Sequence, residues 1–213
     1  MKPAELDVLG QILTHVGSTL DDEALDQQIE SFPLICLTSV DEELHGFLFG
    51  SLERIGGTPC VLWGAGAARK GKNAGPSLKA LVGELYRRAA ISFPDEDVLV
   101  AGQIAHPAGY TLLGGLSDIC PRPGYSPTGE ERAWGRRLAK RFGSKARYDD
   151  KAFRLKPGKQ PARVFDTRTM KVSSTSKAAE MLGSPDPAAG EAMIVFGWAS
   201  AEALEDGLSP GRK

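Results

Sequence analysis

The stretch GAGAARKGKNAGPSLKAL, residues 64–81, decides how this sequence is interpreted. Small residues end an apolar segment, basic residues follow, and a helical pattern begins near Ser77. From Gly66 the letters fit the nucleotide-binding P-loop pattern Gly-x-x-x-x-Gly-Lys-Ser/Thr, except that Asn73 takes the place of the hydroxyl residue. The stretch is therefore either a nucleotide loop or a loop that holds another phosphate at a helix start.

The segments before this stretch predict two helices and three strands. Apolar residues recur at helical spacing over 4–17 and 22–30. Three apolar segments follow, 33–40, 44–55 and 58–67, and each is separated from the next by a very short turn. Because turns this short join antiparallel neighbours, we expect a meander.

The segments after it predict a helix and a further strand. Residues 77–90 carry one apolar stripe, and 98–105 form a run of β-branched and small residues. A basic helix is predicted over 129–142 and a last apolar strand over 192–198. The stripe consists of Leu78, Leu81, Val82, Leu85, Tyr86 and Ala89.

Three features of a P-loop are missing. Asn73 offers no hydroxyl for magnesium, the strand before the loop closes a hairpin, and the strand 98–105 does not end in a carboxylate. A P-loop-like nucleotide binder therefore stays only as an alternative.

Residues 72–77, Lys-Asn-Ala-Gly-Pro-Ser, resemble the Gln/Arg-x-x-Gly-x-Gly/Ala loop of the GNAT acyltransferase superfamily, which holds the pyrophosphate of acetyl-coenzyme A (acetyl-CoA). Unpaired amides and the helix dipole favour an anion at such a place. Lys72 and Ser77 depart from the family pattern. The element order over 1–116 is also similar to that of GNAT proteins, in which a strand splays from the meander to admit the pantetheine arm.

The resemblance implies the fold class and the domain organisation. We expect an α+β protein with a GNAT-like, mixed and mostly antiparallel central sheet, flanked by helices. A single domain would span 1–203, with its core at about 4–116, a C-terminal elaboration at 117–203 and a flexible tail at 204–213.

The resemblance also implies a cofactor, acetyl-CoA or another acyl-CoA, and the residues around it. A bulge in the third meander strand would free an amide, of Ala65 or Ala67, to polarise the thioester carbonyl. Basic side chains would lie at the rim of the loop, and the helix start would hold the pyrophosphate. The predicted cofactor-binding residues are Ala65, Ala67, Arg69, Lys70, Lys72, Asn73, Ala74, Gly75 and Ser77.

Two candidate catalytic residues lie in AHPAGYTLLGGL, residues 105–116. This segment resembles the family's Asn-Pro-x-x-x-x-x-x-Tyr region, with His106 in place of Asn and Tyr110 earlier than usual. Tyr110 would protonate the leaving thiolate, and His106 would act as base or contact the acceptor. A packing tyrosine and a helix-capping histidine are the alternatives. The predicted cleft strand offers no carboxylate as a base, so an inactive GNAT-like binding or regulatory module remains the alternative to an N-acyltransferase.

Charge is strongly segregated along the chain although the net charge is −1. Residues 1–60 carry two basic and eleven acidic side chains, whereas 130–171 carry fourteen basic and five acidic ones. The basic segment is a solvated face, a contact with the acidic segment, or a site for an acidic partner or nucleic acid. No aromatic–basic alternation accompanies it, which disfavours nucleic acid.

Other features of the composition limit location and cofactors. No long apolar run or leader is visible, so we expect a cytoplasmic protein without a membrane partner. The three cysteines lack CxxC spacing, which argues against a disulfide framework and a metal site; Cys36 and Cys60 are expected to be reduced core residues. The acceptor, a small-molecule or peptide amine, is not specified, and a homodimer is left open.

Overall fold

The computed structural model describes residues 7, 10–11, 22–171 and 176–211. Most of the predicted helix 4–17 lies outside these residues. The next helix and the meander are confirmed, because short turns separate their apolar segments as the sequence predicts. The elements are α2 (Asp22–Ser31), β1 (Leu34–Val40), β2 (Glu43–Ile55) and β3 (Thr58–Ala68).

The helix after the quoted stretch is α3 (Ala74–Ser92), which begins earlier than the predicted residue 77. All six residues of its predicted apolar stripe are buried, so the helical spacing identified the face that packs on the sheet. It leads to β4 (Val98–Ile104), whose residues are all buried, and to the short helix α4 (Pro107–Thr111).

The C-terminal part adds strands to the same sheet. The basic helix is α5 (Gly129–Arg141), and a capping box between Thr128 and Glu131 fixes its start. The predicted last strand is β8 (Ala192–Ala199), which pairs with β4 along its whole length. The remaining elements are β5 (Ser117–Cys120), a 3-10 turn (Lys145–Arg147), β6 (Tyr148–Asp149), β7 (Arg154–Leu155), α6 (Lys177–Leu182) and α7 (Ala201–Glu205).

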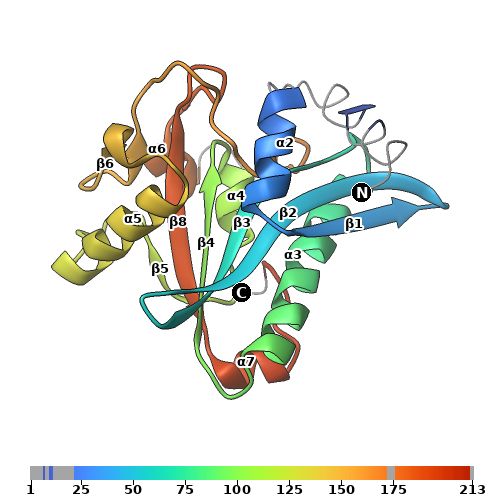
Figure 1. Cartoon of the computed structure of the whole chain (residues 1–213), viewed down its shortest axis with the longest axis horizontal. Helices are drawn as coiled ribbons and strands as arrows, with labels where there is room; N and C mark the ends of the chain where they lie inside the picture. Colours follow the sequence, from blue (N-terminus) through green and yellow to red (C-terminus); the bar gives the residue numbers. More distant parts are fainter. Residues whose placement is uncertain (1–6, 8–9, 12–21, 172–175, 212–213) are drawn as a thin grey trace.

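The described strands form one eight-stranded sheet in the order β1-β2-β3-β4-β8-β7-β6, with β5 also paired to β8. Among them only β3 and β4 pair in parallel, so the protein has the predicted α+β class with a mixed, mostly antiparallel sheet. In Figure 1, α2 and α5 lie on one face and α3 on the other. No helix in the described ranges combines the length and apolar character needed to cross a membrane.

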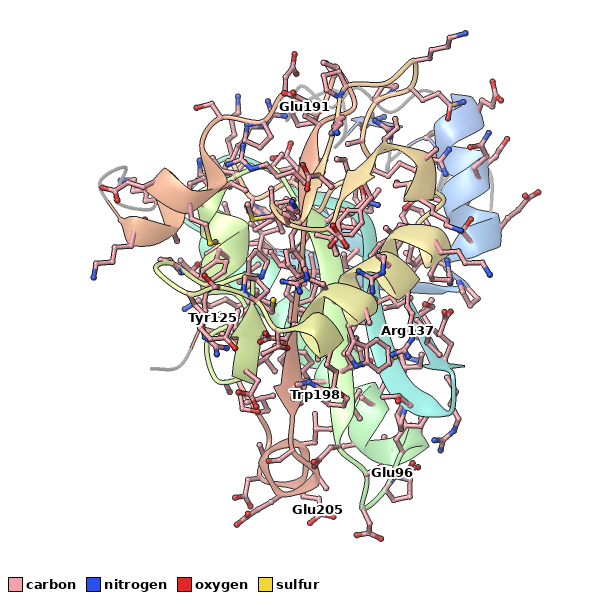
Figure 2. The ribbon with its side chains drawn as sticks, turned by 90° about the vertical axis from the view of Figure 1, so that its left-hand side faces the viewer. Glu96, Tyr125, Arg137, Glu191, Trp198 and Glu205 are labelled. Carbon is pink, nitrogen blue, oxygen red and sulfur yellow. The ribbon has the colours of Figure 1, made fainter. Side chains whose placement is uncertain are left out.

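The face with α5 is held by aromatic contacts. Trp134 on α5 meets Trp198 on β8 edge to face, with ring centroids 6.0 Å apart, and Arg137 covers the Trp134 ring. Figure 2 shows Arg137 and Trp198 on this side of the molecule. At the other end of α5, the Phe142 ring stacks on Phe32, which follows α2. The basic helix is therefore packed through one apolar side rather than fully solvated.

Residues 204–211, the described part of the predicted flexible tail, contact the rest of the protein. Leu204 is buried, and the Gly211 amide donates a hydrogen bond to the Gly114 carbonyl at 3.0 Å. Leu208 packs against the core. Leu204 and Leu208 lie four residues apart, and α7, which contains Leu204, contacts α3. The polar composition of the segment did not predict this contact.

Candidate functional site

The candidate site is the place where β3 and β4 separate. The two strands pair only over Cys60–Trp63 and Leu99–Gly102. Beyond this point β3 continues to Ala68 without pairing to β4. The sheet therefore parts between these strands, and we call this place the parting.

A bulge in β3 lies beside the parting, where the sequence predicted one. Between Trp63 and Gly66, β3 has two residues, whereas the facing part of β2 has only Phe49. The Ala65 amide donates a hydrogen bond to Oε1 of Gln28 at 2.7 Å, and Gln28 is buried. The predicted oxyanion donor at Ala65 is therefore already satisfied by a side chain of α2. Ala67 is buried in register with Phe47 of β2.

The parting is filled by a distant part of the chain, residues 163–170, which we call the bridging segment. The Phe165 amide donates to the Gln103 carbonyl on β4 at 3.1 Å, and the Asp166 amide donates to the Gly66 carbonyl on β3 at 2.8 Å. The buried Phe165 ring lies edge to face with Trp63, with centroids 6.0 Å apart. The bridging segment thus joins the two strands with backbone hydrogen bonds, as an intervening strand would.

The bridging segment continues toward the start of α3. Thr167 is fully buried, and its hydroxyl lies 3.3 Å from where a side chain on Gly109 of α4 would begin. Met170 comes within 4.0 Å of the corresponding position on Gly75. The segment therefore follows β3 from the bulge to the predicted phosphate-binding loop.

The predicted cofactor-binding residues at the start of α3 do come together, but several are engaged. The Ala74 amide donates to the Gly71 carbonyl at 3.2 Å, and the Ser77 amide donates to the Asn73 carbonyl at 2.9 Å. The Ser77 hydroxyl is buried 3.1 Å from Nδ1 of His45. The Asn73 side chain makes no capping hydrogen bond.

The basic residues of the loop remain at the surface. Lys70 and Lys72 are exposed, and Arg69 forms an ion pair with Glu43 at 3.6 Å. They surround a helix start of which some amides are already hydrogen-bonded, so positive charge gathers at this end of α3.

The two predicted catalytic residues face different groups. His106 caps α4, because its Nδ1 accepts from the Ala108 amide at 3.3 Å. Burial lowers the pKa of His106, the Asp166 carboxylate opposes that shift, and Arg168 adds to it. Burial raises the pKa of Tyr110 to about 12, and the Arg122 guanidinium opposes that shift. His106 therefore belongs to the parting, whereas Tyr110 belongs to the surroundings of β5.

Asp166 is the site residue that sequence reasoning missed. Its side chain is only 10% exposed, and it forms an ion pair with Arg168 at 2.6 Å. It brings to the parting a carboxylate that the cleft strand itself lacks. Nothing in the local pattern of residues 163–170 signals this position, because the contacts that place Asp166 come from strands many residues away.

Several buried polar atoms beside the bridging segment are unsatisfied. Six buried side-chain polar atoms have no hydrogen-bond partner in the described part of the chain, and four belong to residues of the bridging segment or of β3 and β4 at the parting. Each such group costs about 1–3 kcal/mol. The four are Nε1 of Trp63, Oε1 of Gln103, and the hydroxyls of Thr167 and Thr169.

Comparison with known proteins gave no relatives: no protein-family model, no curated protein and no solved structure matches this chain. Within the described residues, no group of three or more His, Cys, Asp or Glu side chains could hold a metal ion. The parting and its bridging segment are therefore interpreted from geometry.

Proposed function

We propose that the chain has a GNAT-like fold and serves as a binding or regulatory module, with the bridging segment in the route that acyl-CoA takes in GNAT enzymes. The observation that carries this proposal is the pair of backbone hydrogen bonds from Phe165 and Asp166 to β4 and β3. A pantetheine arm cannot occupy the same space as this backbone. The buried, free cysteines agree with a reducing compartment, and we place the protein in the cytoplasm.

The engaged donors at the site support the same proposal. A transferase of this kind needs a free amide near the bulge to polarise the thioester carbonyl. The Ala65 amide is bound to Gln28 in the interior, and the Ser77 side chain is bound to His45. Opening the site to acyl-CoA would therefore require the bridging segment to leave and the Ala65 amide to exchange its partner.

The second candidate is an N-acyltransferase that uses acetyl-CoA or a longer acyl-CoA and an amine acceptor. The four unsatisfied polar atoms at the parting favour this transferase. They make the packing of the bridging segment less stable and so lower the free energy needed to displace it. Asp166 would leave with the bridging segment, so His106 at the start of α4 would take the proton as the amine nitrogen attacks the thioester carbonyl carbon. The carbon–sulfur bond breaks, and the thiolate leaves and takes a proton.

Thermal unfolding with and without acyl-CoA separates the two candidates. For a closed binding module, acetyl-CoA and a long-chain acyl-CoA leave the melting temperature unchanged. For the transferase, a ligand at a hundred times its Kd adds about 2.7 kcal/mol, a shift of a few degrees. Stabilisation by magnesium-ATP instead of acyl-CoA would restore the P-loop interpretation.

Two substitutions at Gly75 locate any acyl-CoA binding that is found. Gly75→Glu places a carboxylate at the start of α3, where the pyrophosphate would lie, and abolishes the shift if the loop binds it. Gly75→Ala adds only a methyl group, whose nearest neighbour is Met170 at 4.0 Å, and retains the shift. Equal shifts in both folded variants would place the ligand elsewhere.

A further inference from the structure

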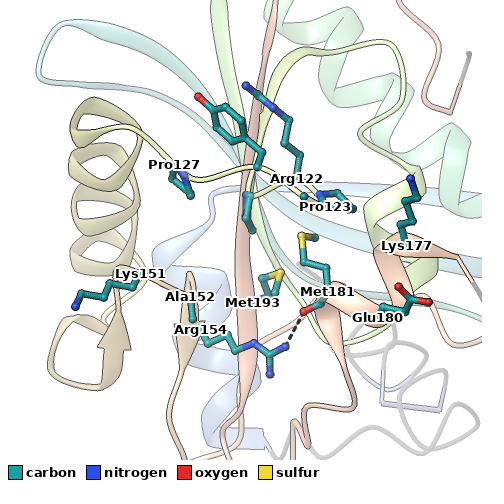
Figure 3. Close-up of a pocket in the computed structure, with 13 residues that line it drawn as sticks. Arg122, Pro123, Pro127, Lys151, Ala152, Arg154, Lys177, Glu180, Met181 and Met193 are labelled. Carbon is teal, nitrogen blue, oxygen red and sulfur yellow. Dashed lines mark hydrogen bonds between the residues drawn. The ribbon is translucent and has the colours of Figure 1, made fainter.

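A second site lies apart from the parting, in a pocket of about 580 Å³. None of its lining residues belongs to the bridging segment. Its walls come from the loop after β5, the β6–β7 hairpin, α6 and β8, which Figure 3 shows around a common opening. The volume lies in the range of small-molecule sites.

The floor of this pocket is apolar and adaptable. Met193 of β8 and Pro121 are buried, and Met181 of α6 is half-buried beside them. Pro123 and Pro127 continue the apolar wall. Thioether side chains fit ligands of irregular shape, so this floor suits the apolar body of a small molecule.

Two arginines of the pocket are fixed in place by the protein. Arg154 donates hydrogen bonds to the carbonyls of Met181 and Leu182 at 2.7 and 2.8 Å, which ties α6 to the hairpin. Arg122 donates to the Ile119 carbonyl, pairs with the Glu131 carboxylate at 3.8 Å, and has its guanidinium 3.5 Å from the centre of the Tyr125 ring. Because these cations are already ordered, a ligand would not have to order them on binding.

Two lysines add mobile positive charge at the rim. Lys151 and Lys177 are exposed, and neither forms an ion pair within the described residues. Figure 3 shows them on opposite sides of Met193. Four lining residues are basic and only Glu180 is acidic, so the pocket concentrates anions.

We propose that this pocket binds a small organic anion with an apolar body, such as an aryl or acyl carboxylate, sulfonate or phosphate ester. The apolar body lies on Met181 and Met193, and the anionic group is held by Lys151 or Lys177 at the rim. The ordered guanidinium group of Arg154 adds positive potential, whereas the charge of Arg122 is offset by its ion pair with Glu131. The pocket does not depend on whether the parting takes acyl-CoA.

The experiment uses two fluorescent probes that differ in charge. 8-Anilinonaphthalene-1-sulfonate carries an aromatic body and an anionic group, whereas N-phenyl-1-naphthylamine has the body alone. The full chain should bind the sulfonate at one saturable site, at least about tenfold more tightly than the neutral probe. Equal affinities for the two probes would overturn the proposal.

Paired charge reversals locate the site. The double variant Lys151→Glu, Lys177→Glu should weaken sulfonate binding about tenfold or more. The control Lys159→Glu, Lys171→Glu makes the same charge change at exposed positions outside the pocket and should leave binding nearly unchanged. If both double variants lost sulfonate affinity equally, binding would depend on the overall charge of the basic segment, and the proposed site would be wrong.

A steric variant tests the pocket without changing charge. Ala152→Trp at the exposed rim should block the sulfonate, whereas Ala146→Trp, exposed but outside the pocket, should not. Cooperative unfolding of each variant verifies its fold, and unchanged binding to a folded Ala152→Trp would overturn the proposal. Acetyl-CoA shifts measured on the same variants report the parting separately, so either site can fail alone.

Discussion

The amide of Asp166 donates a hydrogen bond to the carbonyl of Gly66 at 2.8 Å, which closes the parting of β3 and β4 with a segment a hundred residues away. The next amide toward the N-terminus, that of Phe165, bonds to β4 instead. The two amides of this dipeptide therefore donate hydrogen bonds to one carbonyl on β3 and one on β4, at a place where the two strands no longer pair with each other. Since unpaired carbonyls in the sheet interior are costly, removal of this dipeptide requires a replacement donor, either a ligand or water.

Replacing Phe165 should loosen this closure. Its ring is 1% exposed and packs on Trp63, so Phe165→Ala should destabilise the fold by about 3 kcal/mol in urea unfolding. Hydrogen exchange of the amides at 165 and 166 should accelerate at the same time. The control Leu37→Ala removes a side chain that is 51% exposed and should change stability by less than about 0.5 kcal/mol. An unaltered exchange rate at both amides would show that the ring does not hold the bridging segment.

Gly66 and Gly75 should respond oppositely to the same added methyl group. A Cβ on Gly66 would lie 2.7 Å from the Phe47 carbonyl and 2.9 Å from the Phe165 ring, so Gly66→Ala should destabilise by about 1–3 kcal/mol. Gly75→Ala lies in α3 with open space around it and should stabilise by about 0.5–1 kcal/mol. Urea unfolding measures both, and a neutral Gly66→Ala would mean that Gly66 is in close contact with neither β2 nor the bridging segment.

Most of the sheet could be predicted from local sequence. The turns between the first three strands are so short that only antiparallel neighbours can follow, and the stripe from Leu78 to Ala89 has one helical period. The short strands β6 and β7 could not be predicted, because each pairs over only two residues and has no period of its own. The packed C-terminal segment was also missed, since Leu204 and Leu208 form too short a pattern to outweigh its polar composition.

The candidate site was predictable only in its β3 half. The glycines and alanines after Trp63 located the bulge, because small residues in a strand interior mark irregular backbone. The bridging segment was not predictable, since Phe165 and Asp166 lie in an irregular stretch whose position is set by carbonyls of β3 and β4. Acyl-CoA binding at the start of α3 stays a prediction, as does a catalytic role for Tyr110.

Arg141 links the basic and acidic segments, and this link should be measurable. It bonds to both carboxylate oxygens of Glu53 at 2.6 and 2.9 Å and to the Ser31 carbonyl at 2.7 Å. A double-mutant cycle with Arg141→Met and Glu53→Gln should give a coupling energy of about 1 kcal/mol. The pair Arg54 and Glu96 has similar distances but is more exposed, at 47% and 39% against 25% and 27%.

The cycle for Arg54→Met and Glu96→Gln should therefore give a smaller coupling energy than the Arg141 cycle, because solvent screens the exposed pair. Both cycles are measured by urea unfolding at low salt and at about 0.5 M salt. At 0.5 M salt the Debye length is roughly a few ångströms, so the coupling of the exposed pair should fall further. Equal coupling energies in the two cycles would show that the lower exposure of the Arg141–Glu53 pair does not strengthen it.

The three cysteines should be unreactive in the folded protein. Cys36, Cys60 and Cys120 are free and buried, and the first two lie in the core as the sequence predicted. Burial raises the pKa of Cys36 and Cys60 to about 11 and that of Cys120 to about 12, so little thiolate forms near pH 8. Ellman's reagent should titrate none of them in buffer and all three in urea. Rapid reaction in buffer at one position would show local opening of its strand.

His106 should make the protein less stable in mild acid. Its folded-state pKa lies below the ordinary value of 6.5, chiefly because of burial, so the unfolded chain binds more protons between these two values. The free energy of unfolding therefore rises with pH through this window and falls as the pH drops below 6.5. His106→Asn keeps a side chain that can cap α4 but cannot titrate, and it should flatten the dependence of stability on pH between 5 and 7. The effect is measured by urea unfolding across this pH range, which lies above the pKa values of ordinary carboxylates. If the variant keeps the full slope of the parent chain, the acid sensitivity comes from another group and the burial of His106 beside Asp166 is not its cause.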